Sequence, residues 1–202
     1  MSIVFAETQV NNTKIKREEV SYTLIVDGIE WMRFDDSYIS REQLYSSYDL
    51  AYGKVLLTGF GFGILAEWIA SKDNVTEVHV VEKYPDVIEC FLKNNSMPSK
   101  VKVIIADASE YKSNEKYDCI FIDHYEILPL SEVSQEIVKV SNNVPNHSVI
   151  WGWQFEEIYN TELDILKDYG IDHNRILNYI EKYNKLPKPM SIEETLQYSF
   201  KY

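Results

Sequence analysis

Short apolar segments alternate with amphipathic segments through the middle of the chain. Residues 54–65 read as a strand that opens into a helix, and four later segments have strand character: residues 77–83, 100–108, 116–126 and 147–155. Between them, residues 85–94 and 131–140 place their apolar positions on one helical face. Strands that alternate with helices at this spacing favour right-handed crossovers. The pattern predicts an α/β fold, with helices on both faces of a mainly parallel sheet.

The first 50 residues show a different, β-rich pattern. Two pairs of strand-like segments flank Asn11-Asn12 and Asp27-Gly28, dipeptides that suit the positive φ angles of tight hairpins. Residues 40–50 are polar and rich in tyrosine, which favours a short helix. We predict a small β-rich appendage over residues 1–50 and an α/β domain over residues 51–202.

The last part of the chain has the weakest pattern. Residues 161–169 look helical and are followed by Gly170, whereas residues 175–183 fit a helix or a strand equally well. Residues 191–194 have the form of a capping box that opens a short helix.

Three glycines follow the first apolar strand of the α/β region. Gly59, Gly61 and Gly63 occupy alternate positions, and a helical segment begins directly after them. A strand that passes through glycines into a helix can present bare backbone N–H groups to a nucleotide-like ligand. A tight turn with no ligand explains the same pattern, so the glycines alone do not establish a site.

Acidic residues stand at the ends of the next three strand-like segments. Glu82, Asp107 and Asp123 each come at or just after an apolar run, and ligands bind beyond the carboxyl ends of parallel strands. Each acid also has a structural interpretation: Asp107 suits a cap or turn, and Glu82 a solvated strand end paired with Lys83. Their shared register with the glycines predicts a site along one edge of the sheet.

Composition limits the classes of partner. The 202 residues carry a net charge of −12, which opposes non-specific nucleic-acid binding and is compatible with a cationic or neutral substrate. No apolar run is long enough to span a bilayer, and the sequence shows no secretory leader. Cys90 and Cys119 do not have the spacing of metal ligands, so we expect neither a disulfide nor a zinc site. Free cysteines are typical of a reducing compartment, so we expect a cytoplasmic protein.

The spacing of the glycines distinguishes between classes of nucleotide ligand. A nicotinamide fingerprint places its third glycine one position later, where this chain has Ile64, and no P-loop ending is present. An acid after the third strand suits the exocyclic amine of an adenosyl ligand that has no phosphates.

These motifs resemble a known superfamily. The segments TGFGFG, VVEKYPDVIE, IADASEY and YDCIFID are similar to successive motifs of class I S-adenosylmethionine-dependent transferases, which have a Rossmann-like fold. Within that superfamily the chain is closest to the spermidine synthase (aminopropyltransferase) group, whose N-terminal β piece contains a hairpin like LIVDGIEWMRFDD. The resemblance covers residues 22–155. It implies S-adenosylmethionine, or its decarboxylated form, as the cofactor.

The resemblance also implies roles for individual residues. The turn that contains Gly59, Gly61 and Gly63, called the glycine turn below, would contact the methionine part of the cofactor. Glu82 would bind the two ribose hydroxyls, and Asp107 would accept from the adenine amine. Asp123 would face the reacting centre and the bound cofactor. The complete implied cofactor set is Gly59, Phe60, Gly61, Gly63, Glu82, Lys83, Asp107, Ala108 and Asp123.

The implied acceptor loop is residues 123–126. Asp123 is the first candidate base, with Glu126 as a cation anchor and His124 as the alternative base. The aminopropyltransferases have small residues between their two acids, where this chain has His124 and Tyr125, and they have an acid where this chain has Phe62.

Aromatic residues near the expected site have two interpretations. Tyr125, Trp151 and Trp153 would wall an acceptor pocket or belong to the core.

Three functions remain open from the sequence. The chain lacks the Asn/Asp-Pro-Pro-Tyr loop of enzymes that methylate amino groups of DNA or glutamine. It also lacks the Asp-Asn pair that follows the fifth strand in metal-dependent catechol-type enzymes, so we expect no metal. The first hypothesis is methyl transfer from S-adenosylmethionine to a small molecule. The second is aminopropyl transfer to an amine from the decarboxylated cofactor, and the third is a non-catalytic adenosyl-binding module. The N-terminal β piece suggests a homodimer contact, and we expect no nucleic-acid or membrane partner.

Overall fold

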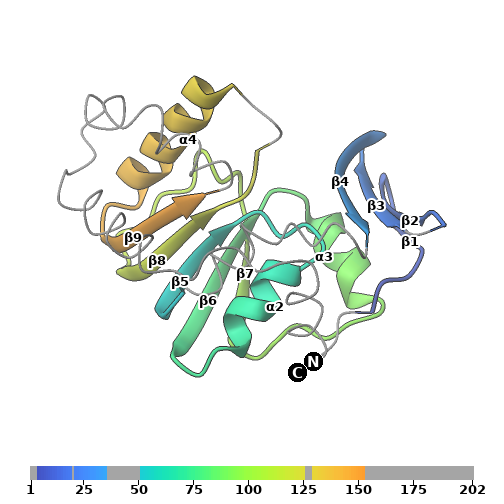
Figure 1. The fold of residues 1–202 in the computed structure, drawn as a ribbon, viewed down its shortest axis with the longest axis horizontal. Coiled ribbons are helices and arrows are strands. Elements are labelled where there is room, and N and C mark those ends of the chain that lie inside the picture. The colour runs from blue at the N-terminus through green and yellow to red at the C-terminus, as the bar shows by residue number, and fades with distance from the viewer. Residues whose placement is uncertain (1–3, 20, 36–50, 126–128, 153–202) are drawn as a thin grey trace, which may run out of the picture.

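A computed structural model describes residues 4–19, 21–35, 51–125 and 129–152 of the chain (Figure 1). The helix expected over residues 40–50 and all elements expected after residue 152 lie outside these described residues. The division at residue 50 falls there as well and stays a prediction.

The larger sheet is parallel throughout its five strands. Its order is β7-β6-β5-β8-β9, with β5 at the centre. The strands are β5 (Gly53–Thr58), β6 (Val75–Glu82), β7 (Val101–Ile105), β8 (Tyr117–Ile122) and β9 (His147–Gly152). The predicted Rossmann-like α/β fold is confirmed.

Three of the four connections between these strands contain a helix, and the connection from β7 to β8 contains none. The helices are α2 (Ile64–Ser71), α3 (Pro85–Leu92) and α4 (Leu130–Asn143). From β5 the chain first moves outward through β6 to β7, then crosses back to β8 and continues to β9. Right-handed crossovers therefore place α2 and α3 on one face of the sheet and α4 on the other. The strand order reverses between β5 and β8, which makes their carboxyl ends a topological switch point.

The central strands are buried on both faces, as their continuous apolar sequences require. Leu56, Val80 and Ile120 are each fully buried, and so are their neighbours along the same three strands. Thr58 and Glu82 are the buried polar residues that end β5 and β6. At the carboxyl edge of the sheet, the buried apolar residues are thus followed directly by polar ones.

The N-terminal residues form a separate antiparallel sheet. Its order is β1-β2-β3-β4, from the strands β1 (Thr8–Val10), β2 (Thr13–Arg17), β3 (Ser21–Val26) and β4 (Ile29–Asp35). Both expected hairpins are present. Asn11 has a φ of 46°, and Asp27 and Gly28 have φ values of 51° and 82°, as primed turns require.

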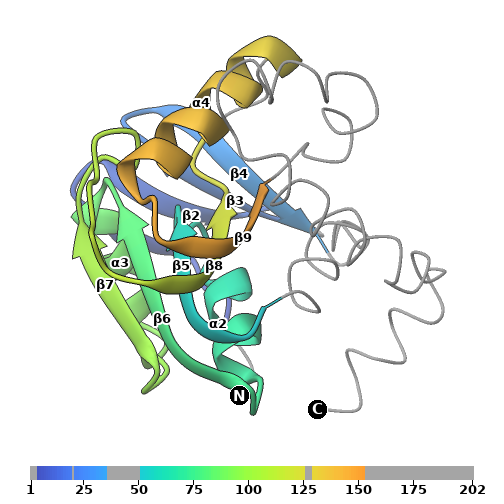
Figure 2. The ribbon, with the colours of Figure 1, turned by 90° about the vertical axis from the view of Figure 1, so that its left-hand side faces the viewer.

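This N-terminal sheet is attached to α3 and to the glycine turn. Lys93 Nζ donates to the Gln9 carbonyl at 2.7 Å, and Asn94 donates to Thr8 Oγ1 at 2.8 Å. Phe62 from the glycine turn packs against Phe5, with the two ring centroids 5.6 Å apart. Figures 1 and 2 show the four strands as a separate layer beside the parallel sheet.

No helix within the described ranges has the length and apolar character needed to cross a bilayer.

Candidate active site

Strand register brings the candidate residues to one edge of the parallel sheet. Thr58 of β5 lies opposite Val81 of β6 and Ile122 of β8. The next residue, Gly59, is therefore beside both Glu82 and Asp123. Glu82 lies opposite Ile105 in turn, which places Asp107 two residues beyond the end of β7. The glycine turn and the three acids share the carboxyl edge of the sheet.

Gly59 makes the closest backbone approach at this edge. Its φ is +85°, and a Cβ there would lie 2.0 Å from the carbonyl oxygen of Asp123. Its N–H donates to the Val81 carbonyl at 2.8 Å, which continues the ladder past the end of β5. Glycine is thus required at position 59 for contact between β5 and β8, whether or not a ligand binds.

Gly61 lies at the outer part of the turn, next to the N-terminal sheet. Its φ is +53°, and a Cβ there would meet the sulfur of Met32 from β4 at 2.9 Å. Phe60 and Phe62, on either side of it, are both buried. The middle of the turn therefore packs against the N-terminal sheet.

Glu82 fastens the glycine turn to the end of β6. One carboxylate oxygen accepts from the Phe60 N–H at 2.9 Å, and the other accepts from the Tyr84 N–H at 2.8 Å. The residue is 6% exposed. Each oxygen retains a second lone pair, so the carboxylate can accept further hydrogen bonds at this edge.

Asp107 and Lys83 form an ion pair above the ends of β6 and β7. Lys83 Nζ lies 2.9 Å from one carboxylate oxygen of Asp107, and the Ser109 N–H donates to the other at 3.0 Å. The hydrogen bond from Lys83 lowers the pKa of Asp107, against a smaller opposing effect of burial. The partner of Lys83 is thus Asp107 and not Glu82. Ala108, the next residue, is buried.

Asp123 is held at the end of β8 by its backbone N–H. Its N–H donates to both the carbonyl oxygen of Thr58, at 3.0 Å, and Thr58 Oγ1, at 3.2 Å. The residue as a whole is exposed. Surrounding protein nevertheless desolvates the carboxyl and raises its pKa to about 6, an effect that the nearby His124 partly offsets.

His124 is held between β5 and α4. Its Nδ1 lies 2.7 Å from Thr58 Oγ1, and its Nε2 lies 3.5 Å from Glu136 Oε2. Glu136 also accepts from Ser109 Oγ at 2.8 Å. Its contact with His124 is the main cause that lowers the pKa of Glu136.

The remaining candidates divide between the core and the part of the chain outside the described residues. Trp151 is 5% exposed and packs near Phe121, with ring centroids 6.4 Å apart, which supports the core interpretation. Tyr125 is half-buried, and burial raises the pKa of its hydroxyl. Glu126 and Trp153 lie outside the described residues, so their roles stay predictions, as do the ligand roles of the residues above.

Three residues at this edge were not identified from the sequence: Thr58, Ser109 and Glu136. Thr58 gave a weak signal, since it is a polar residue at the end of a wholly apolar strand. Glu136 gave none, because one acid on the polar face of an amphipathic helix is indistinguishable from the others.

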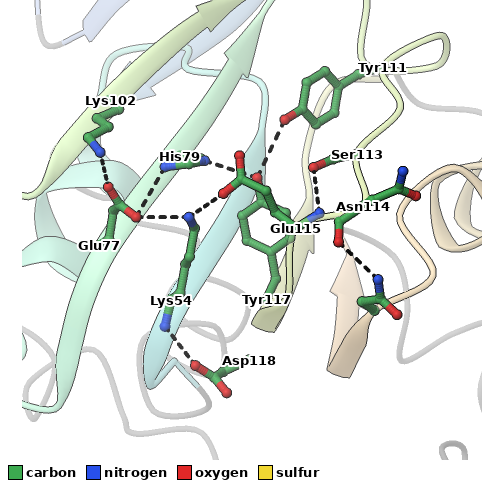
Figure 3. Close-up of polar contacts among 11 residues, drawn as sticks. Lys54, Glu77, His79, Lys102, Tyr111, Ser113, Asn114, Glu115, Tyr117 and Asp118 are labelled. Carbon is green, nitrogen blue, oxygen red and sulfur yellow. Dashed lines mark hydrogen bonds and ion pairs between the residues drawn. The ribbon is translucent and has the colours of Figure 1, made fainter.

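The opposite, amino-terminal edge of the sheet carries a separate polar cluster (Figure 3). Glu77 contacts Lys54 Nζ at 2.9 Å and pairs with Lys102 as well, and these bonds lower the pKa of Glu77 to about 2. His79 is buried beside it, with Nδ1 2.9 Å from the Tyr117 hydroxyl. These groups bind one another, so the cluster fits a structural role.

Across the described ranges, no three His, Cys, Asp or Glu side chains are placed to hold one metal ion.

Comparisons with known proteins gave structural neighbours only. No family model matches the chain, and no curated protein matches it in sequence. The neighbours include a spermidine synthase in complex with the transition-state analogue AdoDATO, at 19% identity and a TM-score of 0.49. That match covers 69% of this chain and 52% of the synthase.

Two further neighbours belong to the same broad groups. Spermidine synthase from Thermotoga maritima matches at 16% identity and a TM-score of 0.48, over 87% of this chain and 62% of that one. Phosphoethanolamine N-methyltransferase 1 from Haemonchus contortus, in complex with phosphoethanolamine and S-adenosylhomocysteine, matches at 17% identity and a TM-score of 0.39. That match covers 52% of this chain and 24% of the methyltransferase. The chain thus spans about half to three fifths of the two synthases.

These neighbours are two spermidine synthases and a methyltransferase, the groups that the sequence resembles. At such identities and TM-scores they carry no argument about chemistry. The strand order and the carboxyl edge of this chain's own sheet support the proposal below.

Proposed function

We propose that this protein is an S-adenosylmethionine-dependent transferase that methylates a small-molecule acceptor. One observation carries the proposal: the glycine turn, Glu82, Asp107 and Asp123 follow four adjacent parallel strands at a topological switch point. An elongated ligand with a polar group at each end fits such a row. Each acid has local partners, but a row of three acids on either side of the glycine turn is typical of a ligand site at this edge.

The residues present fit an adenosyl cofactor. Glu82 keeps a free lone pair on each oxygen for the two ribose hydroxyls, and its bond to the Phe60 N–H joins this acid to the glycine turn. Asp107 is 40% exposed at its side chain and remains an ionised acceptor for an exocyclic amine.

Asp123 is the group we assign to the acceptor. When bound, the cofactor supplies a carbon that a nucleophile displaces from sulfur, so the protein needs to align the acceptor and remove its proton. With a pKa of about 6, roughly nine tenths of the Asp123 carboxyl is ionised at pH 7. An ionised carboxylate orients an amine or hydroxyl and accepts its proton.

The glycine turn favours methyl transfer over aminopropyl transfer. Phe62 stands where the aminopropyltransferases have an acid, and its ring packs into the apolar contact with Phe5 and Phe34. No charge at this position repels a cofactor carboxylate, so we expect S-adenosylmethionine to bind more tightly than its decarboxylated form.

Aminopropyl transfer is the second candidate. The observed β3–β4 hairpin at Asp27-Gly28 favours it, since the resemblance places such a hairpin in that group.

Calorimetry with three adenosyl compounds tests both functions. S-adenosylmethionine, its decarboxylated form and the thioether product are titrated into the wild type and into Glu82→Gln. We expect the first to bind more tightly than the second. We also expect Glu82→Gln to weaken binding by about 2 kcal/mol, the value of a hydrogen bond to a charged group.

The outcomes separate the hypotheses. Preference for the decarboxylated form, with consumption of putrescine or spermidine, supports aminopropyl transfer instead. Binding with no turnover on an amine and hydroxyl panel supports an adenosyl-binding module. No binding of any of the three compounds refutes all of these functions.

A further inference from the structure

A run of polar contacts joins the turn after β7 to the end of β8, and α4 supplies its central acceptor. Glu136 Oε2 accepts from Ser109 Oγ at 2.8 Å, and the same oxygen lies 3.5 Å from His124 Nε2. On the other side of the imidazole, Nδ1 lies 2.7 Å from Thr58 Oγ1. Thr58 Oγ1 accepts in turn from the Asp123 N–H at 3.2 Å.

With His124 neutral, the chemistry of these groups assigns a direction to each hydrogen bond. An ionised carboxylate only accepts, so Ser109 Oγ donates to Glu136. His124 Nε2 makes no hydrogen bond to Glu136, but the negative charge 3.5 Å away favours the ring proton on this nitrogen. In a neutral imidazole the other nitrogen is then an acceptor, and Thr58 donates its hydroxyl proton to Nδ1. The hydroxyl oxygen is left to accept from Asp123. Thr58 alone cannot select this tautomer, because a hydroxyl donates or accepts with equal ease.

We infer that Glu136 is a positioning residue for Asp123, acting through His124 and Thr58. The inference rests on the proposed function only where it assigns Asp123 to the acceptor. In this arrangement Nδ1 of His124 accepts from Thr58, and Nε2 carries its proton on the side of the Glu136 carboxylate without a hydrogen bond. His124 therefore serves to hold the end of β5 against the end of β8. The proton of an acceptor passes to Asp123.

The connection also extends to the adenine side of the candidate site. The Ser109 N–H donates to Asp107, while its hydroxyl donates to Glu136. A helix on the far face of the sheet thus contacts both the turn that follows β7 and the loop that follows β8. Glu136 lies between the cofactor acid and the acceptor acid.

The tautomer of His124 is the decisive measurement. Long-range 1H–15N correlation spectra show which ring nitrogen carries the proton. The chain has four histidines, so His124→Gln assigns the signal. We expect the Nε2–H form in the wild type and a mixture, or the Nδ1–H form, in Glu136→Ala. Glu136→Gln should restore the wild-type form, since its amide oxygen still accepts.

A matched control and a second readout complete the test. Glu132 is exposed on the same helix, one turn before Glu136, and Glu132→Ala should leave the tautomer unchanged. Hydrogen exchange of the Asp123 amide should quicken about tenfold in Glu136→Ala and return in Glu136→Gln, because the Thr58 hydroxyl loses its fixed orientation.

If His124 of the wild type carries its proton on Nδ1, the inference is wrong, and no variant is needed to show it. The inference is also wrong if folded Glu136→Ala keeps the wild-type tautomer. If Glu136→Ala fails to fold, Glu136→Leu takes its place, since it removes the carboxylate while keeping a side chain of similar size. Titration of S-adenosylmethionine into the wild type separates the two proposals. Absence of binding refutes the proposed function, whereas the spectra alone decide the role of Glu136.

Discussion

Replacement of Gly59 by alanine should cost far more stability than the same replacement at Gly28. The two glycines have nearly equal φ angles, +85° and +82°, so the cost of a left-handed alanine is the same at both. That cost is about 1–2 kcal/mol. A Cβ added at Gly28 would point into open space, with nothing within 4 Å, whereas at Gly59 it would lie 2.0 Å from the Asp123 carbonyl oxygen.

The overlap at Gly59 has no easy relief. The Asp123 carbonyl cannot turn aside freely, because the Asp123 N–H is bonded to Thr58 and the preceding strand, β8, is buried in the core. Overpacking adds about 1–3 kcal/mol, so the expected loss for Gly59→Ala is roughly 2–5 kcal/mol.

Urea unfolding of the wild type and both variants, followed by circular dichroism, gives the three free energies of unfolding. The difference between the variants isolates the contact between β5 and β8. A difference below about 1 kcal/mol would mean that the backbones at the two strand ends are not in contact, and would refute the geometry proposed for the site.

Three further predictions concern the acidic residues. Ion pairs hold the pKa of Glu77 at about 2, below its ordinary 4.5, so their contribution to stability is present above pH 4.5 and is lost as the pH falls toward 2. After solvent screening we expect Glu77→Gln to lower the free energy of unfolding by about 1–2 kcal/mol at pH 7, and a loss that does not shrink in acid contradicts this cause. A 13C titration of the Asp123 carboxyl should give a pKa near 6, and a value below 4 would remove it as a tuned base. Asp107→Ala should bind adenosine and inosine forms of the thioether product with similar affinity, whereas a retained preference would leave Asp107 as a turn residue only.

The sequence predicted the fold better than it predicted the site. Apolar runs such as residues 55–57 are long enough to specify buried parallel strands, and Asp27-Gly28 specifies its turn through local backbone geometry alone. The positions of Glu82 and Asp107 at strand ends also follow from periodicity. Their partners do not, because Lys83 has two acids within reach and only the tertiary arrangement selects Asp107.

His124 illustrates the same limit more sharply. A histidine beside a candidate catalytic acid suggests a base, but its function depends on what contacts each ring nitrogen. Those contacts come from Thr58 and Glu136, which lie 66 residues before it and on the following helix, respectively. No local pattern encodes either contact. The glycine at position 59 is similar, since its steric requirement comes from Asp123.

The central place of β5 has a consequence for synthesis on the ribosome. Its two neighbours are β6, which follows soon after it, and β8, which ends at Ile122. During translation one side of β5 stays unpaired until β8 has left the exit tunnel, and the glycine turn has no Asp123 to rest against. The late strand β8 must pair with β5, the first strand of the sheet, and such non-local pairing is slow. A nascent chain halted before residue 123 therefore exposes an apolar strand edge, and such chains are natural clients for a chaperone.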